Sequence, residues 1–496
     1  MVRTIHSNSS RLGGVLAAPP TLEAPIPGPD RPSGAQSSGS QPDAGREPLL
    51  DFWRACSILA VVVGHYLVAG VVRDGTALRG VNMLAVAPRL QSLTWAFQVM
   101  PLFFVVGGAS NLVSLQRASQ EGRSMPWVRS RIAKLMVPVG VFLVLLCAVI
   151  TIARASGVAP WMIETAVRAS TIQFWFLAVY ILITLCSPLL VRVYRRFGRG
   201  SLVNLGALIA LVDLISLQTD RGAPLGWLNA ATVWIFCTLV GFELRVHLMR
   251  SHAGTTVRLL GEESSTRRVG WLLMGVGIGL GVALVRFGGY PISLIGVPGQ
   301  ARSNTSPPSL MLICACSWQV GFLLASRGLV ESFCARRRVG RSLGVLNLQA
   351  MSIYCWHMAA FVLTALVAEV LGYSVTMRPT GSETILTGST TLIGSTSWWL
   401  AKPLWVLLSA LATVGLVLLV APIQVRLARR VLGTSSGGNL AVVGAAAVIL
   451  ATAAVRITTG HLVGTGWSPI DTTTALLLFV GPVLLWWPIE SQAKPQ

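Results

Sequence analysis

Long apolar segments alternate with short polar or basic clusters along nearly the whole chain after residue 49. A helix needs about 20 predominantly apolar residues to cross the hydrocarbon core of a bilayer. Twelve segments approach that length, although Asp213 interrupts the fifth of them. They lie near residues 50–71, 93–115, 132–154, 174–194, 201–219, 227–244, 270–287, 308–326, 346–371, 401–424, 438–456 and 472–489. The pattern predicts an all-α, polytopic integral-membrane helical bundle.

The first 47 residues have a different character. They are rich in Pro, Gly, Ser and Ala and show no apolar periodicity. A segment of this composition cannot bury enough apolar surface to fold, so we expect residues 1–47 to form a disordered cytoplasmic tail. No apolar run precedes Leu49. We therefore expect no cleavable signal peptide, and the first span itself should direct insertion.

The overall composition favours a membrane protein over a soluble globule. The chain is 53% hydrophobic and 11% charged, with a mean hydropathy of +0.67. Its net charge of +21 comes from basic clusters between the apolar segments. Residues so placed set topology and contact lipid headgroups, which argues against nucleic acid as a partner.

The distribution of basic residues predicts the topology. Of the 39 Lys and Arg residues, 27 fall in the tail and alternate loops, 11 fall in the remaining loops, and Arg54 lies inside the first span. The positive-inside rule therefore predicts that the N- and C-termini are cytoplasmic. Lys is scarce beside Arg, a bias typical of GC-rich bacterial genomes such as those of actinobacteria.

The eight cysteines lie almost entirely within apolar segments, where Cys behaves as a small hydrophobe. Cys314 and Cys316 have no second pair of ligands beside them, so we expect no zinc site. We expect no requirement for disulfides either.

Arg54 and His65 lie eleven residues apart inside the first apolar segment. Ionisable residues in a membrane span are costly to bury and usually face a cavity or a partner. Eleven residues is close to three helical turns, which puts both side chains on one face, about 16 Å apart along the axis. His65 can exchange protons near neutral pH, or it can simply hydrogen-bond to a neighbouring helix. Arg54 can bind an anion, pair with an acidic side chain, or extend to the headgroups.

The second apolar segment and the basic run after it contain further candidate residues. That segment contains Phe103-Phe104 and then Gly107-Gly108, with Asn111 at its cytoplasmic end. Paired glycines allow a helix or a ligand to approach the backbone closely. A basic run that includes Arg129 and Arg131 comes next, and it can attract an anionic ligand or only set topology.

Two later segments carry polar residues in apolar surroundings. Gln173 and Trp175 open the fourth segment at its predicted extracytoplasmic mouth, where an amide and aromatic rings suit a sugar or polyol. An interfacial aromatic belt explains Trp175 equally well. The ninth segment carries Ser352, Tyr354 and His357. His357 is the best candidate for a second functional imidazole, with a helix–helix hydrogen bond as the alternative.

These motifs together resemble those of the acyltransferase-3 family of integral-membrane enzymes, over most of residues 50–424. The elements in common are Arg54 followed eleven positions later by His65, Phe103-Phe104 followed by Gly108, Arg129-x-Arg131-Ile132 followed by Pro138, Trp175-Phe176-Leu177, and Ser352-x-Tyr354-x-x-His357. Two positions depart from the pattern. Gly107 stands where many members have Ser, and Gln173 stands where many have His.

The resemblance implies an O-acyltransferase that moves an acyl group, often acetyl, from a cytoplasmic acyl-CoA to a hydroxyl of a cell-envelope carbohydrate or related acceptor. Acyl-CoA is then a co-substrate, with no permanently bound cofactor and no metal, and the acceptor is a carbohydrate or lipid-linked molecule in contact with membrane lipids. The expected catalytic residues are His65, as the base that activates the hydroxyl, and Arg54, which grips a coenzyme A phosphate or orients the thioester. The expected substrate-binding residues are Asn111, Arg129, Arg131, Gln173, Trp175, Ser352, Tyr354 and His357.

The resemblance also divides the chain. We expect a ten-helix acyltransferase domain in residues 48–424, then two added helices and a short tail in residues 425–496, all in the cell membrane. No Ser stands in a recognisable nucleophile motif, which favours direct transfer assisted by His65. The alternative function is a multi-pass secondary transporter or exporter of a polar envelope or metabolite substrate, with Arg54, His65, His357 and Asp213 along its path. The halves of the sequence show no inverted repeat that would support it.

Overall fold

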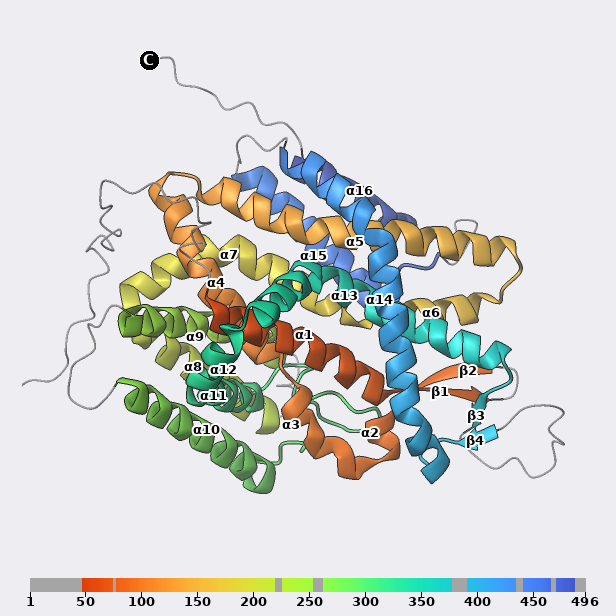
Figure 1. The fold of residues 1–496 in the computed structure, drawn as a ribbon, viewed down its shortest axis with the longest axis horizontal. Coiled ribbons are helices and arrows are strands. Elements are labelled where there is room, and N and C mark those ends of the chain that lie inside the picture. Colours follow the sequence, from red (N-terminus) through yellow and green to blue (C-terminus); the bar gives the residue numbers. More distant parts are fainter. Residues whose placement is uncertain are drawn as a thin grey trace, which may run out of the picture.

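The computed structural model describes residues 47–74, 77–218, 225–252, 262–376, 390–433, 440–464 and 470–486, and most of them are helical (Figure 1). Within these ranges ten helical segments are long and apolar enough to cross a membrane, and a bent pair of helices adds an eleventh. The predicted polytopic membrane bundle is therefore confirmed. The predicted disordered tail, apart from Glu47, lies outside the described residues.

Each of the twelve apolar segments forms a helix. The ten principal helices are α1 (Pro48–Val68), α4 (Met100–Gln120), α5 (Ser124–Ala155), α7 (Trp175–Phe197), α8 (Arg199–Gln218), α9 (Asn229–His252), α10 (Glu262–Phe287), α13 (Arg337–Val370), α14 (Thr396–Gly433) and α15 (Leu440–Thr458). The bent pair is α11 (Leu310–Ala325) with α12 (Arg327–Cys334), at 59°. The last helix, α16 (Thr472–Trp486), is apolar but short. Shorter helices are α2 (Met83–Val86), η1 (Pro88–Leu93), α3 (Thr94–Phe97), α6 (Pro160–Thr171), η2 (Ile172–Phe174) and η4 (Leu225–Leu228).

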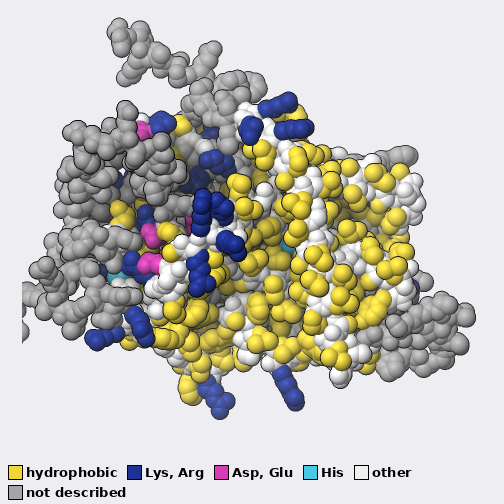
Figure 2. Space-filling model, viewed as in Figure 1, with side chains coloured by type: hydrophobic (Ala, Val, Ile, Leu, Met, Phe, Trp, Pro, Cys, Tyr) yellow, Lys and Arg dark blue, Asp and Glu magenta, His cyan; other side chains and the backbone are white. Residues whose placement is uncertain are grey.

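A small four-stranded sheet lies at one end of the bundle (Figure 1). Strands β1 (Ala69–Asp74) and β2 (Ala77–Asn82) pair antiparallel, and β1, β3 (Ser374–Thr376) and β4 (Thr390–Leu392) pair parallel, in the order β2-β1-β3-β4. The strands connect to α1, α13 and α14. Lys and Arg side chains gather mainly toward the opposite end of the face shown in Figure 2, and the half nearer the sheet is mostly hydrophobic.

Two glycines bring α4 and α9 into direct backbone contact. A Cβ added at Gly108 would overlap the Thr238 carbonyl oxygen, and one added at Gly241 would overlap the Val105 carbonyl oxygen. Any larger residue at either position would therefore push the two helices apart. The adjacent Gly107 faces elsewhere, toward the Tyr180 ring, which a Cβ would meet at 3.5 Å.

The two C-terminal helices pack directly against the rest of the bundle. The buried Arg129 side chain on α5 donates from Nε to the Leu485 carbonyl oxygen of α16 at 2.7 Å. Between α15 and α16, Asp471 accepts from the Thr474 backbone N–H at 2.7 Å and so caps α16. That N–H, supported by Arg456, lowers the pKa of Asp471 to about 2, so the cap stays charged at neutral pH.

Asp213 ties four parts of the fold together from inside α8. Its carboxylate is 6% exposed and accepts from Asn229 Nδ2 at 2.8 Å, the Tyr290 hydroxyl at 2.9 Å and the Leu310 backbone N–H at 2.6 Å. Burial and then the Asp213 charge raise the pKa of the Tyr290 hydroxyl, so Tyr290 remains a donor. These partners come from α9, α11 and the segment before α11, so the Asp213 carboxylate is not the acidic partner of Arg54 and does not pair with His65.

Replacing Asp213 with Ala should destabilise the protein by roughly 3 kcal/mol, because it leaves three donors without their acceptor in a buried site. Thermal unfolding of the purified protein in detergent measures the change. Leu214→Ala is the matched control, since Leu214 is the next residue and 52% exposed. Equal unfolding temperatures for the two variants would contradict the assigned role of Asp213.

Candidate active site

His65 and His357 form a hydrogen-bonded pair between α1 and α13. Nδ1 of His65 lies 2.9 Å from Nε2 of His357. The ring centroids are 5.1 Å apart with 16° between the planes, so the two nitrogens are much closer than the centroids and point at each other edge to edge. His357 is fully buried and His65 is half-buried. Of the pair, only His65 is thus open to a ligand.

The backbone around His357 fixes which nitrogens carry hydrogen. Nδ1 of His357 lies 2.8 Å from the Tyr354 carbonyl oxygen and 3.2 Å from that of Ile353. Carbonyl oxygens only accept, so Nδ1 of His357 is the donor and its Nε2 carries the lone pair when the ring is neutral. His65 must then donate from Nδ1. Its own Nε2 is left with a lone pair, as a general base requires.

Two contacts hold the end of α1 that carries His65. The neighbouring Tyr66 side chain is buried, and its hydroxyl donates to the His357 carbonyl oxygen at 3.0 Å. Lys402, at the start of α14, donates from Nζ to the Ala69 carbonyl oxygen at 2.7 Å. A cation at the carboxyl end of a helix also complements the helix dipole. α1 is therefore fixed against α13 and α14 at the level of the two imidazoles.

Gln173 and Tyr354 lock α13 to the segment before α7. The Tyr354 hydroxyl donates to the Gln173 carbonyl oxygen at 2.5 Å, and Gln173 Nε2 lies 3.4 Å from the Tyr354 carbonyl oxygen. Both side chains are buried. The carbonyl that receives Gln173 is the one that accepts from His357, so Gln173 and Tyr354 help to place the second imidazole.

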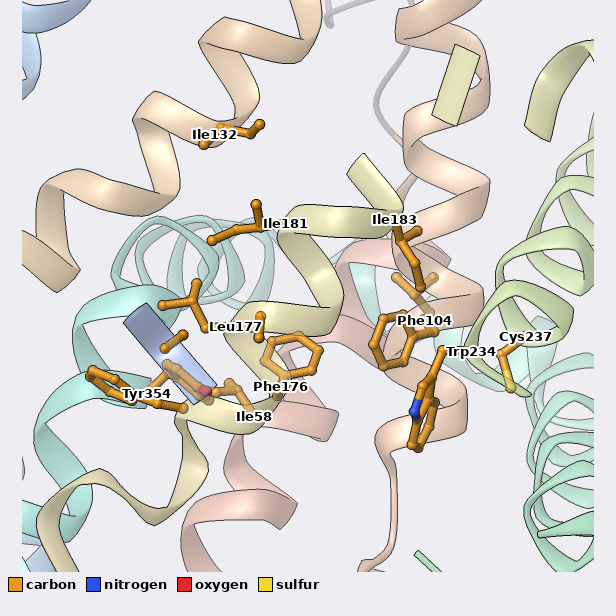
Figure 3. Close-up of a cluster of buried hydrophobic side chains, with 14 of the residues drawn as sticks. Ile58, Phe104, Ile132, Phe176, Leu177, Ile181, Ile183, Trp234, Cys237 and Tyr354 are labelled. Atoms are coloured by element: carbon orange, nitrogen blue, oxygen red, sulfur yellow. The ribbon is translucent and has the colours of Figure 1, made fainter. Parts of the chain in front are cut away.

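An apolar pocket lies beside α1, between the levels of Arg54 and His65. Its walls come from four helices and consist of Ile58, Val61, Met100, Phe103, Phe176, Ala350, Met351 and Tyr354. Its empty volume is about 340 Å³, counting the open space at its mouth. Figure 3 shows Ile58, Phe176 and Tyr354 lying together. Neither Arg54 nor His65 belongs to these walls, so the pocket forms an apolar stretch between the two polar levels of α1.

Arg54 lies on α1 about one turn before the pocket residue Ile58 and has two partners. Its guanidinium contacts Asp51 Oδ1 at 3.2 Å and donates to Ser110 Oγ of α4 at 2.6 Å. Its side chain keeps 27% of its surface exposed, and so it remains open to a further anionic ligand. Arg54 thus pairs with an acidic residue of its own helix turn, one of the alternatives that the sequence left open.

A basic cluster surrounds Arg54. Arg131 of α5 lies close enough to Arg54 for their charges to repel, and Lys134 lies close to Arg131 in the same way. Nη2 of Arg131 donates to Ser114 Oγ at 3.0 Å, and its guanidinium lies 5.3 Å from the centre of the Trp127 ring. Such a cluster suits a ligand with several negative charges.

One face of α4 connects the cluster to the pocket. Phe103 lines the pocket, Gly107 faces Tyr180, Ser110 contacts Arg54 and Ser114 contacts Arg131. These positions recur at helical spacing, so they form one continuous stripe. Tyr180 stands midway, packed against Phe103. The stripe leads from the basic residues, past the Ser114 and Ser110 hydroxyls, to the apolar pocket, and the imidazole pair lies beyond the pocket along α1. We call this row of groups the path.

The remaining candidates lie beside this path. Arg129 faces α16 as described above, and Asn111 is buried with its carbonyl accepting from Ser114 Oγ at 3.2 Å. Trp175 packs against Trp234 of α9, with ring centroids 5.7 Å apart. Ser352 donates to Gln424 of α14, on the side of α13 away from the pocket.

Several residues on the path were missed by the sequence analysis. Ser110 and Ser114 follow Phe103 at spacings of seven and eleven, so a helical projection of the second segment would have found them. Tyr66, Trp127 and Tyr180 gave no such signal, because an aromatic residue in an apolar or interfacial segment is ordinary.

One comparison with known proteins, against models of protein families, gives a match. A family model described as an acyltransferase domain matches residues 48–422. The match runs from the start of α1 to near the end of α14 and includes both imidazoles and the basic cluster. No curated protein and no solved structure matches the chain.

Proposed function

The chain belongs to the acyltransferase-3 family of membrane acyltransferases, and from that premise we propose that it transfers an acyl group from cytoplasmic acyl-CoA to a hydroxyl of a cell-envelope carbohydrate or related acceptor. The observation that carries the proposal is the imidazole pair. It leaves a lone pair at His65 Nε2, on the helix that also contributes Ile58 and Val61 to the apolar pocket and Arg54 to the basic cluster.

The reaction needs a single base. Nε2 of His65 takes the proton of the acceptor hydroxyl as the oxygen attacks the thioester carbonyl carbon. The C–O bond forms, the C–S bond breaks, and His65 returns the proton to the departing sulfur, giving an ester and free coenzyme A. While His65 holds the proton, its Nδ1–H donates to His357 Nε2, which stabilises the imidazolium.

The two polar ends of the path suit the two ends of the donor. Phosphates of coenzyme A bind at Arg54 and Arg131 on the side that the charge distribution assigns to the cytoplasm, and the thioester reaches His65 through the apolar pocket. The acceptor then approaches from the side of the sheet, and the transferred acyl group is acetyl. The enzyme lies in the cell membrane with both termini in the cytoplasm.

Release of free coenzyme A tests the proposal. Purified full-length protein in lipid should release coenzyme A from acetyl-CoA, measured with a thiol reagent, and a polyol or sugar acceptor should raise the rate. Absence of release from acetyl-CoA and from longer acyl-CoA donors, with such acceptors present, would reject the acyl-CoA-dependent function and return the transporter alternative to consideration.

Arg54→Ala should raise KM for acyl-CoA by roughly 10- to 100-fold, the effect of losing a charge-assisted hydrogen bond. kcat should change less, because Arg54 lies far along α1 from His65. Arg123→Ala is the matched control, since Arg123 is exposed on the same side of the bundle and pairs with Glu121. An unchanged KM in Arg54→Ala would leave Arg54 with only its structural pairing to Asp51.

A further inference from the structure

We propose that the basic end of the path is a nucleotide site, in which the Trp127 indole stacks on the purine base of the donor and Arg131 binds the adjoining phosphates. The inference rests on the proposed function and narrows it. It states that the enzyme recognises the nucleotide of coenzyme A and not only a phosphopantetheine arm.

Trp127 has a fixed and accessible ring. It lies in the first turn of α5, and its Nε1–H donates to Ser114 Oγ of α4 at 3.2 Å. The side chain is half-buried, so part of the ring is open to a ligand. Stacking on an aromatic ring is how proteins commonly hold a base, and a guanidinium over the ring, as Arg131 has here, strengthens such a stack.

The charges around Trp127 favour an anionic ligand. Arg131 lies within range of charge repulsion from both Arg54 and Lys134. Asp51 pairs with Arg54, and the part of the chain that the structure describes gives Arg131 and Lys134 no ion-pair partner. Lys134 is exposed, but Arg54 and Arg131 are half-buried, and holding those two cations together is unfavourable unless a ligand neutralises them. The diphosphate and 3′-phosphate of coenzyme A carry several negative charges next to the base.

The order of residues along the path places the nucleotide at this end. Ser114, Ser110, Gly107 and Phe103 follow one another on α4 from the basic cluster to the pocket. The pocket walls are apolar and offer no partner for phosphates or for the polar edge of a base. A donor whose thioester reaches His65 therefore leaves its nucleotide beside Trp127.

Binding of two soluble ligands tests the site directly. Coenzyme A and 4′-phosphopantetheine share the arm and one phosphate, but only coenzyme A has the nucleotide. In calorimetry on the full-length protein in lipid nanodiscs, coenzyme A should bind wild type at least about tenfold tighter than 4′-phosphopantetheine. Trp127→Leu should lose about tenfold for coenzyme A and nothing for 4′-phosphopantetheine. Trp127→Phe should keep most of the affinity, and Trp271→Leu, at an exposed site on α10, should keep all of it.

Two results would overturn the inference. Equal affinity of wild type for the two ligands would remove the nucleotide contact. Equal losses for both ligands in Trp127→Leu would reduce Trp127 to a residue that places Arg131. Turnover separates this inference from the proposed function: tight coenzyme A binding without release from acyl-CoA would reject the transfer and keep the site. Release from acyl-phosphopantetheine as efficient as from acyl-CoA would support the transfer and reject the site.

Discussion

Replacing His65 with Asn should lower kcat for acyl transfer by about 10²- to 10⁴-fold, the usual contribution of a general base. The Asn amide can still donate to His357 Nε2 from the position of Nδ1, so the contact between α1 and α13 is kept. It has no atom at the position of Nε2, where the lone pair is needed. The affinity for coenzyme A should stay within a few-fold of wild type, because the proposed phosphate site lies at the far end of α1.

The measurement is the rate of coenzyme A release at saturating acyl-CoA, with the unfolding temperature of each variant recorded beside it. His65→Ala should lose as much activity as His65→Asn. His461→Ala is the control, since His461 is an exposed imidazole between α15 and α16. Turnover of His65→Asn close to that of wild type would exclude His65 as the base and leave the imidazole pair as a packing contact.

Much of the fold could be predicted from hydropathy alone, because a helix that crosses a bilayer must carry a long apolar run. All twelve apolar segments form helices. The sheet was not predicted, since β3 and β4 have three residues each, too few for a period of two to be recognised. Helix α6 was missed for a related reason: it has 12 residues and is too short to read as a span.

The site could be predicted in part. Helical spacing placed Arg54 and His65 on one face of α1, and the pocket lies between their levels on that helix. The contact of His65 with His357 joins residues 292 positions apart, and no pattern within either helix contains that information. Arg129 and Arg131 show a different limit. Two residues apart on a helix, they point in different directions, but only the packing of α16 decides which one is buried.

A site for the proposed reaction must meet two opposing requirements. A charged donor needs cations and hydroxyls, which are costly to bury in a membrane, whereas a lone pair on imidazole is best protected from water. The chain separates them along α1, with Arg54 near one end and His65 near the other and apolar walls between. In the proposed reaction, this separation keeps the negative charges of the donor at the basic end while its thioester reaches His65.

In the proposed mechanism His357 acts through His65, which would make it a positioning residue whose substitutions have a specific pattern of effects. Its Nδ1–H is held by the Tyr354 carbonyl, and its Nε2 fixes the tautomer of His65. His357→Leu removes both contacts and should lower kcat by about 10²-fold, because His65 is then free to carry its hydrogen on Nε2. KM for acyl-CoA should change little.

Amide substitutions at position 357 separate this role from packing. In His357→Gln the side-chain oxygen can occupy the place of Nε2 and accept from His65 Nδ1–H, whereas in His357→Asn the amide reaches only the place of Nδ1 and the Tyr354 carbonyl. Activity should therefore fall in the order wild type, Gln, Asn, with Asn close to Leu in kcat. If His357 acted only through packing, kcat would instead depend on the volume of the side chain at position 357 and on the stability of each variant. kcat would then follow the unfolding temperatures of the variants. Equal rates for Gln and Asn at equal stability would show that the hydrogen bond between the imidazoles does not direct the lone pair of His65.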